Sequence, residues 1–332
     1  MCHRREREKR FGATIHTYKD IISVENLLAS WQEFLRGKRK RMDVAEFSLK
    51  FFDNIHLLHE ELKNKTYRHG GYQAFKINDP KPRDIHKAMV RDRLVHHAIY
   101  RTLYSYFDSK FIYNSYSCRK NKGTHRAINR FRDFGRKVSV NHTKTCWVLK
   151  CDIRKFFANI DHKILKTILA KHVFDTDVLL LLEQVIDSFD FGLPLGNLTS
   201  QLLVNIYMNE FDHFIKRELK VTYYIRYADD FVILSSDKEY LEGLISKISH
   251  FLEVKLKLQL HPHKVFIKTF SSGVDFLGWV HFPHHRIPRT SSKRKMLRKL
   301  KSNPRPESLA SYKGMMKHGN TYKVFLKYFF LF

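Results

Sequence analysis

The chain has 332 residues, 43% of them hydrophobic, and its 61 Lys and Arg outnumber 33 Asp and Glu, for a formal net charge of +28. This apolar and aromatic content excludes a disordered chain, and the length allows two or three subdomains. The charge argues against an enzyme of small metabolites. It is typical either of a basic, well solvated surface or of a polyanion-binding protein, and it favours a nucleic-acid partner.

The sequence gives no signal for export or for a membrane. Cys2, Cys118, Cys146 and Cys151 form no CxxC pair and no zinc pattern with histidine, so we expect reduced cysteines, as in a cytoplasm. The N-terminal MCHRREREKR has no apolar run behind its charges, unlike a secretory signal. No apolar run approaches the ~20 residues of a membrane span. We expect FLKYFFLF (325–332) to pack on the body or on a partner.

The first part of the chain shows mainly helical spacing of apolar residues. The predicted elements are a helix at 24–36, a helix at 43–64, a loop or hairpin at 76–85, a helix at 88–107, and a basic loop that becomes a basic helix within 115–134.

From residue 147 strands enter the pattern. The predicted elements are a strand at 147–153, a helix at 176–189, a turn-rich loop at 191–201, a helix at about 200–219, a hairpin at 222–234, a helix after Asp237, strands at 258–260, 264–270 and 274–282, and a basic, mostly helical segment from 286. Strands and helices alternate without a regular βαβ cadence, so the predicted fold class is α+β.

Adjacent aspartates stand inside IRYADDFVIL (225–234), between apolar runs suited to burial. Buried carboxylates are costly unless a cation neutralises them. Asp152 stands near the end of the strand at 147–153, and two strands side by side would bring it to Asp229. Oxygen ligands suit Mg²⁺, and two such ions about 4 Å apart clamp both oxygens of a phosphoryl displacement. The plain alternative is a polar hairpin turn.

YADD (227–230) resembles the YxDD box of the reverse transcriptase family, and CDIRKFF (151–157) resembles its first palm motif. The resemblance implies catalysis by Asp152, Asp229 and Asp230 with two Mg²⁺, for which Mn²⁺ can substitute. Asp152 and Asp229 would bind both metals, and Asp230 would lie nearby and be less directly involved. The metal residues that it implies are Asp152, Ile153, Asp229 and Asp230. Phe157 matches the steric gate, an aromatic ring that excludes a ribose 2′-OH, and is also compatible with a core aromatic beside Phe156.

Further matches extend over about residues 74–290. LPLGNLTSQ (193–201) resembles the loop–helix motif that lines nucleotide and template, HPHK (261–264) the motif with a lysine near the triphosphate, and KINDPKPRDI (76–85) the triphosphate-binding hairpin. The residues implied at the dNTP are Lys76, Arg83, Phe157, Leu195, Gly196, Gln201 and Lys264. Lys264 would be the general acid for the leaving pyrophosphate, or else an ordinary surface lysine.

Two more segments resemble nucleic-acid contacts of the family. SCRKNKGTHRA (117–127) resembles the fingers segment that contacts template, and FLGW (276–279) resembles the primer-grip turn. The residues implied at template or primer are Arg119, Lys122, His125, Tyr227, Leu277 and Gly278. The first three are equally compatible with solvated charges.

The resemblance implies a right-hand polymerase that extends a primer on an RNA template with dNTPs. Its predicted parts are an N-terminal helical extension (1–70), fingers (71–145), a palm (146–285) and a short basic thumb (286–332). We expect a cytoplasmic, bacterial or phage-encoded protein.

LGxxxSQ (195–201) departs from the QGxxxSP of most retroviral and group II intron enzymes. It resembles the enzymes of diversity-generating retroelements, which copy a template RNA with errors at adenines and act with a small helical accessory protein. Two alternatives stay open. One is a bacterial antiviral-defence reverse transcriptase with a dedicated noncoding RNA, and the other is a non-catalytic RNA-binding protein that kept the fold.

Overall fold

The computed structural model describes residues 17–78, 82–302 and 305–322, so the packing predicted for 325–332 lies outside the described residues. The chain forms two compact units, each assembled from segments that are distant in sequence. Unit 1 takes its described residues from Met1–Tyr113, Lys155–Phe214 and Leu252–Leu258, and unit 2 takes them from Asn114–Arg154, Ile215–Phe251 and Gln259–Phe332. The predicted boundaries of fingers, palm and thumb stay a prediction.

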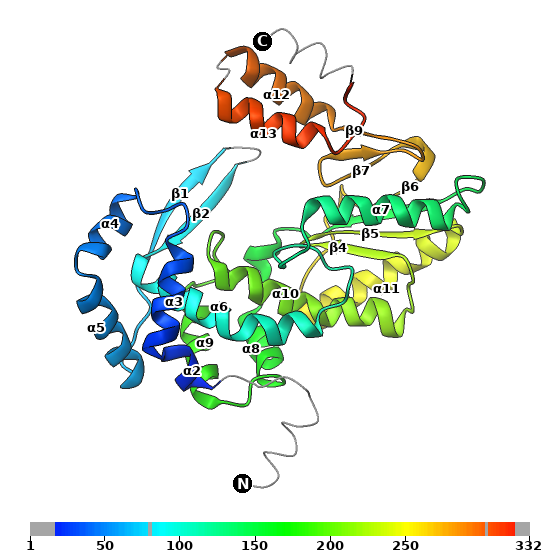
Figure 1. Ribbon diagram of the computed structural model, residues 1–332. Helices are drawn as coiled ribbons and strands as arrows, with labels where there is room; N and C mark the ends of the chain where they lie inside the picture. Colours follow the sequence, from blue (N-terminus) through cyan, green and yellow to red (C-terminus); the bar gives the residue numbers. More distant parts are fainter. Residues whose placement is uncertain (1–16, 79–81, 303–304, 323–332) are drawn as a thin grey trace. The chain divides into compact units, whose positions relative to one another are not determined.

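Unit 1 is mainly helical (Figure 1). The long helix α6 (Val90–Lys110) packs against α3 and α10 and is buried on most sides, as its apolar residues Leu94, Val95, Ile99 and Leu103 require. The other elements of unit 1 are α2 (Tyr18–Ile22), α3 (Val24–Phe34), α4 (Met42–Leu49), α5 (Phe51–Lys63), the hairpin β1 (Tyr72–Ile77) and β2 (Arg83–Ala88), the 3₁₀ turn η1 (Phe156–Asn159), α8 (His162–Ala170), α9 (Thr176–Asp187) and α10 (Leu198–His213).

The helix predicted at 43–64 is two helices, because Lys50 leaves the helical conformation with φ −116° and ψ 42°. The Asn54 side chain donates a hydrogen bond to Phe47 O at 2.9 Å and so satisfies a carbonyl at the end of α4. No Gly or Pro marks this break in the sequence. The short helices α2 and α8 also lie outside the predicted elements; Asp161 caps α8 by accepting from Ile164 N at 3.0 Å.

Unit 2 is built on a four-stranded antiparallel sheet in the order β4 (Tyr224–Tyr227), β5 (Asp230–Ser235), β3 (Trp147–Asp152) and β6 (Phe266–Thr269). The helices α7 (Thr124–Val138) and α11 (Lys238–Leu256) lie on opposite sides of this sheet in Figure 1. Val148 and Val232 pack with α7 residues such as Phe131. Leu149, Phe231 and Ile233, which point to the other face, are buried too, which explains why β3 and β5 carry apolar residues on both faces.

A smaller sheet of unit 2 contains β7 (Val274–Phe276), β8 (Trp279–His281) and β9 (Arg286–Pro288). The strand predicted at 274–282 is therefore a hairpin, which Leu277 (φ 52°) and Gly278 (φ 85°) reverse in two residues. The strand predicted at 258–260 contributes only a bridge between Leu260 and Ile153.

The segment from 286 begins as a strand and continues as two helices. These are α12 (Thr290–Ser302) and α13 (Pro306–Met316), which pack through Met296, Leu300 and Met316. A π-helical segment η2 (Phe214–Glu218) and a 3₁₀ turn η3 (Phe270–Ser272) complete the described elements.

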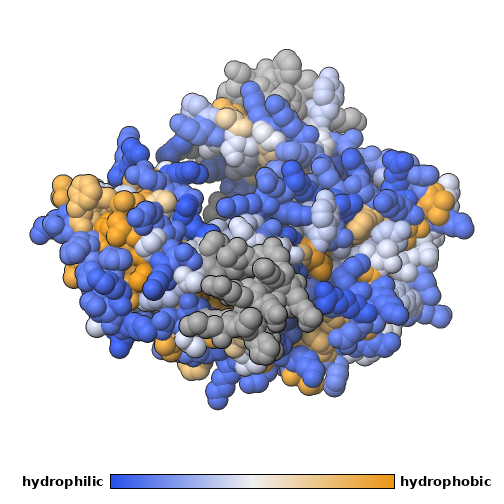
Figure 2. Space-filling model, turned by 60° about the horizontal axis from the view of Figure 1, so that its bottom comes forward, coloured by the Kyte–Doolittle hydropathy of each residue, from blue (hydrophilic) through white to orange (hydrophobic). Residues whose placement is uncertain are grey.

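The surface of the protein is rich in hydrophilic residues, as the large number of charged residues in the sequence leads us to expect. The face shown in Figure 2 is largely hydrophilic, with hydrophobic residues in separate groups. Large apolar side chains that are well exposed include Met42, Leu49 and Phe52 of α4 and α5. Within the described ranges, no helix combines the length and the apolar character that crossing a bilayer requires.

Candidate active site

Three aspartates gather at one end of the four-stranded sheet of unit 2. Asp152 ends β3 and Asp230 begins β5, and the antiparallel register places these two residues directly opposite each other. Asp229 lies in the turn between β4 and β5, where its backbone oxygen accepts a hydrogen bond from Ile153 N at 3.1 Å. The sheet thus brings the predicted catalytic and metal-binding residues together, although their roles stay a prediction.

The turn that carries Asp229 is strained and braced. Ala228 has a φ of 55°, which costs a residue with a Cβ roughly 1–2 kcal/mol. The guanidinium of Arg226, 1% exposed, donates to Ala228 O at 3.2 Å and to Ser115 Oγ at 3.1 Å. The backbone of Arg226 also bonds with Asn114 and Tyr116. This role of Arg226 was not predicted from the sequence. The feature that could have indicated it is a positively charged residue within the apolar run before the aspartates.

Two lysines face the carboxylates. Lys264 Nζ lies 2.9 Å from Asp152 Oδ1, and Lys150 Nζ lies 3.3 Å from Asp230 Oδ2. Burial raises the pKa of Asp230 to about 7, an effect that Lys150 opposes and the charges of Asp229 and Asp152 reinforce. A cation bound beside these carboxylates would favour the charged form of Asp230.

The donor set suits a hard divalent cation. Asp230 Oδ1 is buried and accepts no hydrogen bond from the described part of the chain. No three His, Cys, Asp or Glu side chains of the described residues converge as a complete metal cage. Mg²⁺ does not need one, since it binds through one or two carboxylates together with water and substrate phosphates. Asp152, Asp229 and Asp230 would hold it.

The residues predicted at template and primer lie in unit 2, and most have local contacts. Arg119 Nη1 donates to Ser115 O at 3.1 Å, and the Tyr227 hydroxyl accepts from Thr124 Oγ1 at 3.1 Å. His125 stacks on His318 with 3.6 Å between ring centroids. The remaining three are Lys122, whose Nζ lies 5.3 Å from the Tyr116 ring centroid, and Leu277 and Gly278 of the β7–β8 turn.

The residues predicted at the dNTP lie in unit 1, except Lys264. Phe157, in η1, accepts a hydrogen bond at its backbone oxygen from Leu193 N at 2.8 Å. A Cβ at Gly192, where φ is 66°, would come within 2.2 Å of that oxygen, so only glycine fits there. Phe157 also keeps an edge-to-face contact with Phe156, with 5.5 Å between centroids.

The loop–helix motif is joined to the β1–β2 hairpin. His86 N donates to Leu195 O at 3.0 Å, and Asn197 Nδ2 donates to His86 O at 2.9 Å. A Cβ at Gly196 would meet Ile85 Cγ2 at 2.8 Å. Lys76 and Arg83 are exposed on this hairpin, and Gln201 lies in the first turn of α10. Unit 1 therefore gathers Leu195, Gly196 and the hairpin through direct contacts.

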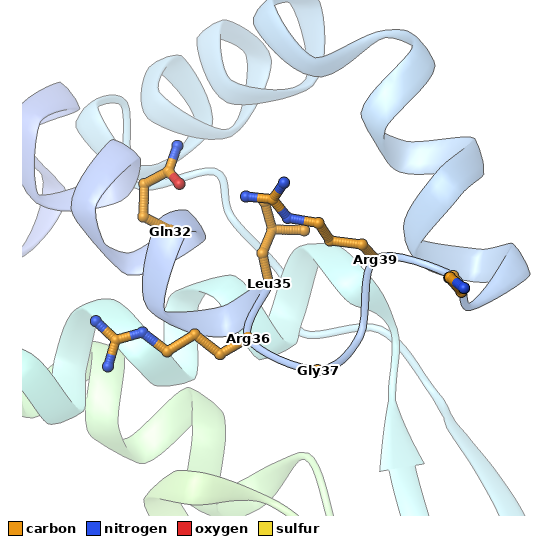
Figure 3. Close-up of a pocket in the computed structure, with 6 residues that line it drawn as sticks. Gln32, Leu35, Arg36, Gly37 and Arg39 are labelled. Atoms are coloured by element: carbon orange, nitrogen blue, oxygen red, sulfur yellow. The ribbon is translucent and has the colours of Figure 1, made fainter.

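A basic hollow lies at the turn between α3 and α4 (Figure 3). Its lining residues are Gln32, Leu35, Arg36, Gly37, Arg39 and Lys40. Arg39 reaches back over Leu35, and Arg36 points away from it (Figure 3). The nearby acids are engaged elsewhere: Asp43 pairs with Lys87 and Arg93, and Glu33 pairs with Arg101. Within the described residues, the cations lining this turn have no ion pair, which leaves them available to an anion.

The arrangement of helices and sheets is that of the right-hand polymerase fold, and comparison with solved structures supports this fold. Apo telomerase from Candida tropicalis, truncated from its C-terminal domain, superposes with a TM-score of 0.51 at 13% identity, over 69% of this chain and 58% of that one. Telomerase from Candida albicans in complex with a fragment of telomeric RNA gives 0.51 at 10% identity, over 69% and 48%. These likenesses show the fold.

The family follows from the sequence comparison. The model of the reverse transcriptase (RNA-dependent DNA polymerase) family matches residues 76–281, and the chain belongs to that family. Protein YkfC of Escherichia coli (strain K12) is 26% identical over 66% of this chain and 66% of its own length. The group II intron-encoded protein LtrA of Lactococcus lactis is 23% identical over 68% of this chain and 49% of its own. The chain thus spans about half to two thirds of these relatives.

Proposed function

We propose that this protein is an RNA-directed DNA polymerase that makes cDNA from a dedicated template RNA. The observation that carries the proposal is the register of β3 and β5, which sets Asp152 opposite Asp230 with Asp229 in the adjoining turn. A non-catalytic RNA-binding protein has no use for clustered acids, because they repel phosphate. When bound, two Mg²⁺ ions would supply charge compensation for the attacking and leaving oxygens.

The chain's own residues have the following proposed parts in nucleotidyl transfer. The primer 3′-OH gives its proton to water and its oxygen forms a bond to the α-phosphorus of a dNTP, while the bond from that phosphorus to pyrophosphate breaks. Lys264 gives a proton to the leaving pyrophosphate. Arg83 and Lys76 hold triphosphate oxygens, and Phe157 excludes a 2′-OH. Arg119, Lys122 and His125 contact template, Tyr227 contacts template or primer, and the Leu277–Gly278 turn holds the primer.

The finer proposal concerns lineage. Leu195 and Gln201 support a diversity-generating retroelement enzyme that copies adenines with errors and acts with a small helical accessory protein in a bacterial cytoplasm. The antiviral-defence enzyme remains the second candidate, favoured by the same basic surface and by the same family match. Sequencing of the RNA that copurifies with the protein, and of cDNA made from it, separates the two. Adenine-dependent errors support the first, and uniform fidelity supports the second.

Primer extension on a defined RNA with Mg²⁺ and dNTPs tests the general proposal. Asp229→Asn should abolish extension and leave RNA affinity nearly unchanged, since the carboxylate serves a metal rather than a phosphate. Asp133→Asn is the matched control, because Asp133 is an exposed acid on α7 of the same unit. Extension by Asp229→Asn within tenfold of the parent would contradict the assignment.

A further inference from the structure

Lys150 is a largely buried lysine two residues before Asp152. Its side chain is 12% exposed, and Nζ contacts Asp230 Oδ2 at 3.3 Å while donating to Asp275 O at 2.8 Å. A buried ammonium is costly unless its donors are used. Here one partner begins β5 of the four-stranded sheet and the other belongs to β7 of the smaller sheet. Lys150 is therefore a polar link between two sheets that share no backbone ladder.

The contacts continue beyond Asp275. The Asp275 carboxylate forms an ion pair with Arg289, whose Nη2 donates to Oδ1 at 2.6 Å. The backbone N of Arg289 donates to Gly278 O at 2.9 Å. A residue-to-residue series of polar contacts, which changes between backbone and side chain at Asp275 and at Arg289, therefore runs from a carboxylate of the candidate active site to the turn at Leu277 and Gly278. Its members, in order, are Asp230, Lys150, Asp275, Arg289 and Gly278.

We propose that Lys150 is a positioning residue that fixes the β7–β8 turn relative to the aspartates. This inference rests on the proposed function, in which the turn holds the primer end. Both ends of the series adjoin a strained turn: Ala228, two residues before Asp230, has a φ of 55°, and Leu277, just before Gly278, has a φ of 52°. Strained turns keep their shape only where surrounding contacts hold them. An error of 1 Å in the placement of reacting groups costs on the order of 10²-fold in rate.

A fluorescence measurement on the primer end can distinguish a positioning role of Lys150 from a purely stabilising one, because it does not depend on activity. A primer carrying 2-aminopurine at its 3′ end, annealed to RNA and bound without dNTP, reports how that end is held. Lys150→Met keeps the side-chain length but removes the charge and the donors. It should move the terminal fluorescence toward the value of free duplex and slow extension about tenfold or more. The duplex dissociation constant should stay within twofold, and Lys150→Arg should restore most of the rate.

Controls and second variants make every outcome decisive. Lys268→Met, an exposed lysine on the neighbouring strand β6, should match the parent in both readouts. Arg289→Met breaks the series at its other end and should reproduce the effect; it decides the question if Lys150→Met fails to fold. Parental fluorescence in these variants overturns the inference, whether the rate is parental or reduced, as does a rate loss fully explained by weaker duplex binding. A parent that extends no primer contradicts the proposed function instead.

Discussion

Lys264 and Asp152 form an ion pair, Nζ to Oδ1 at 2.9 Å, although 112 residues separate them in the chain. The loop of Lys264 is also held by backbone, because His261 N donates to Asp152 O at 2.7 Å and Lys264 N donates to His261 O at 3.0 Å. The side chain of Lys264 and the loop that carries it are thus both attached to Asp152. The contact places a proton donor beside the residue predicted to hold the metals.

Lys264→Leu should therefore lower the single-turnover rate about 10²-fold, as expected for loss of a general acid. The melting temperature should change little, because the Lys264 side chain is 42% exposed and such pairs contribute roughly 0–1 kcal/mol. Rapid-quench extension and thermal unfolding measure the two quantities. A single-turnover rate within twofold of the parent would mean that Lys264 is an ordinary surface lysine and not the general acid.

Phe157→Val should let ribonucleotides compete with deoxynucleotides, because it opens space where the aromatic ring stood. We expect the preference for dNTP over rNTP, measured as the ratio of kcat/KM values, to fall at least about tenfold, or about 1.4 kcal/mol. Phe174→Ala, an exposed aromatic of the same unit, serves as the control. Unchanged sugar selection would mean that Phe157 only packs against Phe156.

Leu195→Gln should lower errors opposite template adenine more than it changes the extension rate. The Leu195 side chain has bulk but forms no directional hydrogen bond, so it can discriminate only weakly against a mispaired nucleotide. Base selection rests on differences of a few kcal/mol between the transition states for the correct and the wrong nucleotide. A gain of about 1.4 kcal/mol lowers the error about tenfold. Sequencing of cDNA from one defined RNA measures this. If the parent already copies adenine as accurately as the other bases, the diversity-generating proposal fails.

The basic hollow should contribute to RNA binding through phosphate contacts. Affinity of the parent should fall ~10³-fold or more between 50 and 200 mM salt if 6–10 phosphates are contacted. Replacing both Arg39 and Lys40 with Gln should reduce the slope of log K against log[salt] by roughly 1 to 2. Filter binding over a salt series measures the slope, with Lys247→Gln on the exposed side of α11 as the control. If the RNA affinity of the parent does not change with salt, the positive net charge of the chain does not serve nucleic-acid binding.

The stability that His96 and His281 contribute should decrease as the pH falls from 6.5 toward 3. Burial lowers the pKa of His96 and of His281 to about 3, whereas an unfolded histidine titrates near 6.5. Between these values the unfolded chain binds protons that the folded chain does not. Each histidine therefore removes up to about 1.4 kcal/mol of unfolding free energy per pH unit. His281 contacts Phe131, and His281→Phe should weaken the pH dependence of the unfolding free energy measured by urea unfolding. An unchanged slope of that free energy against pH would contradict the lowered pKa of His281.

The sequence predicted the hairpin around Asp229 because its signals are local. Two apolar runs separated by a two-residue turn specify β4 and β5, and the observed strands pair across Ala228 and Asp229. Short motifs such as YADD (227–230) and CDIRKFF (151–157) likewise predicted the family and the right-hand fold. The roles of individual site residues stay predictions, since geometry shows where the side chains lie and not what they bind.

Other features depend on contacts between distant residues, which a local pattern does not contain. Lys150 and Arg226 are cations inside apolar strands, and their partners Asp275 and Ser115 are 125 and 111 residues away. The break at Lys50 has no Gly or Pro, and it is stabilised by the side chain of Asn54. In each case tertiary contacts decide what local propensity leaves open.

The central position of β3 in its sheet has a consequence for how the protein is made. β3 emerges from the ribosome before both of its neighbours, since β5 begins at residue 230 and β6 at 266. At about 5–20 residues per second, its two unpaired edges wait for several seconds. During that time Cys151, buried in the finished sheet, is open to oxidants. Yield of the native protein should therefore depend on chaperones and reductant during synthesis, even though Cys151 is fully buried once the sheet has folded.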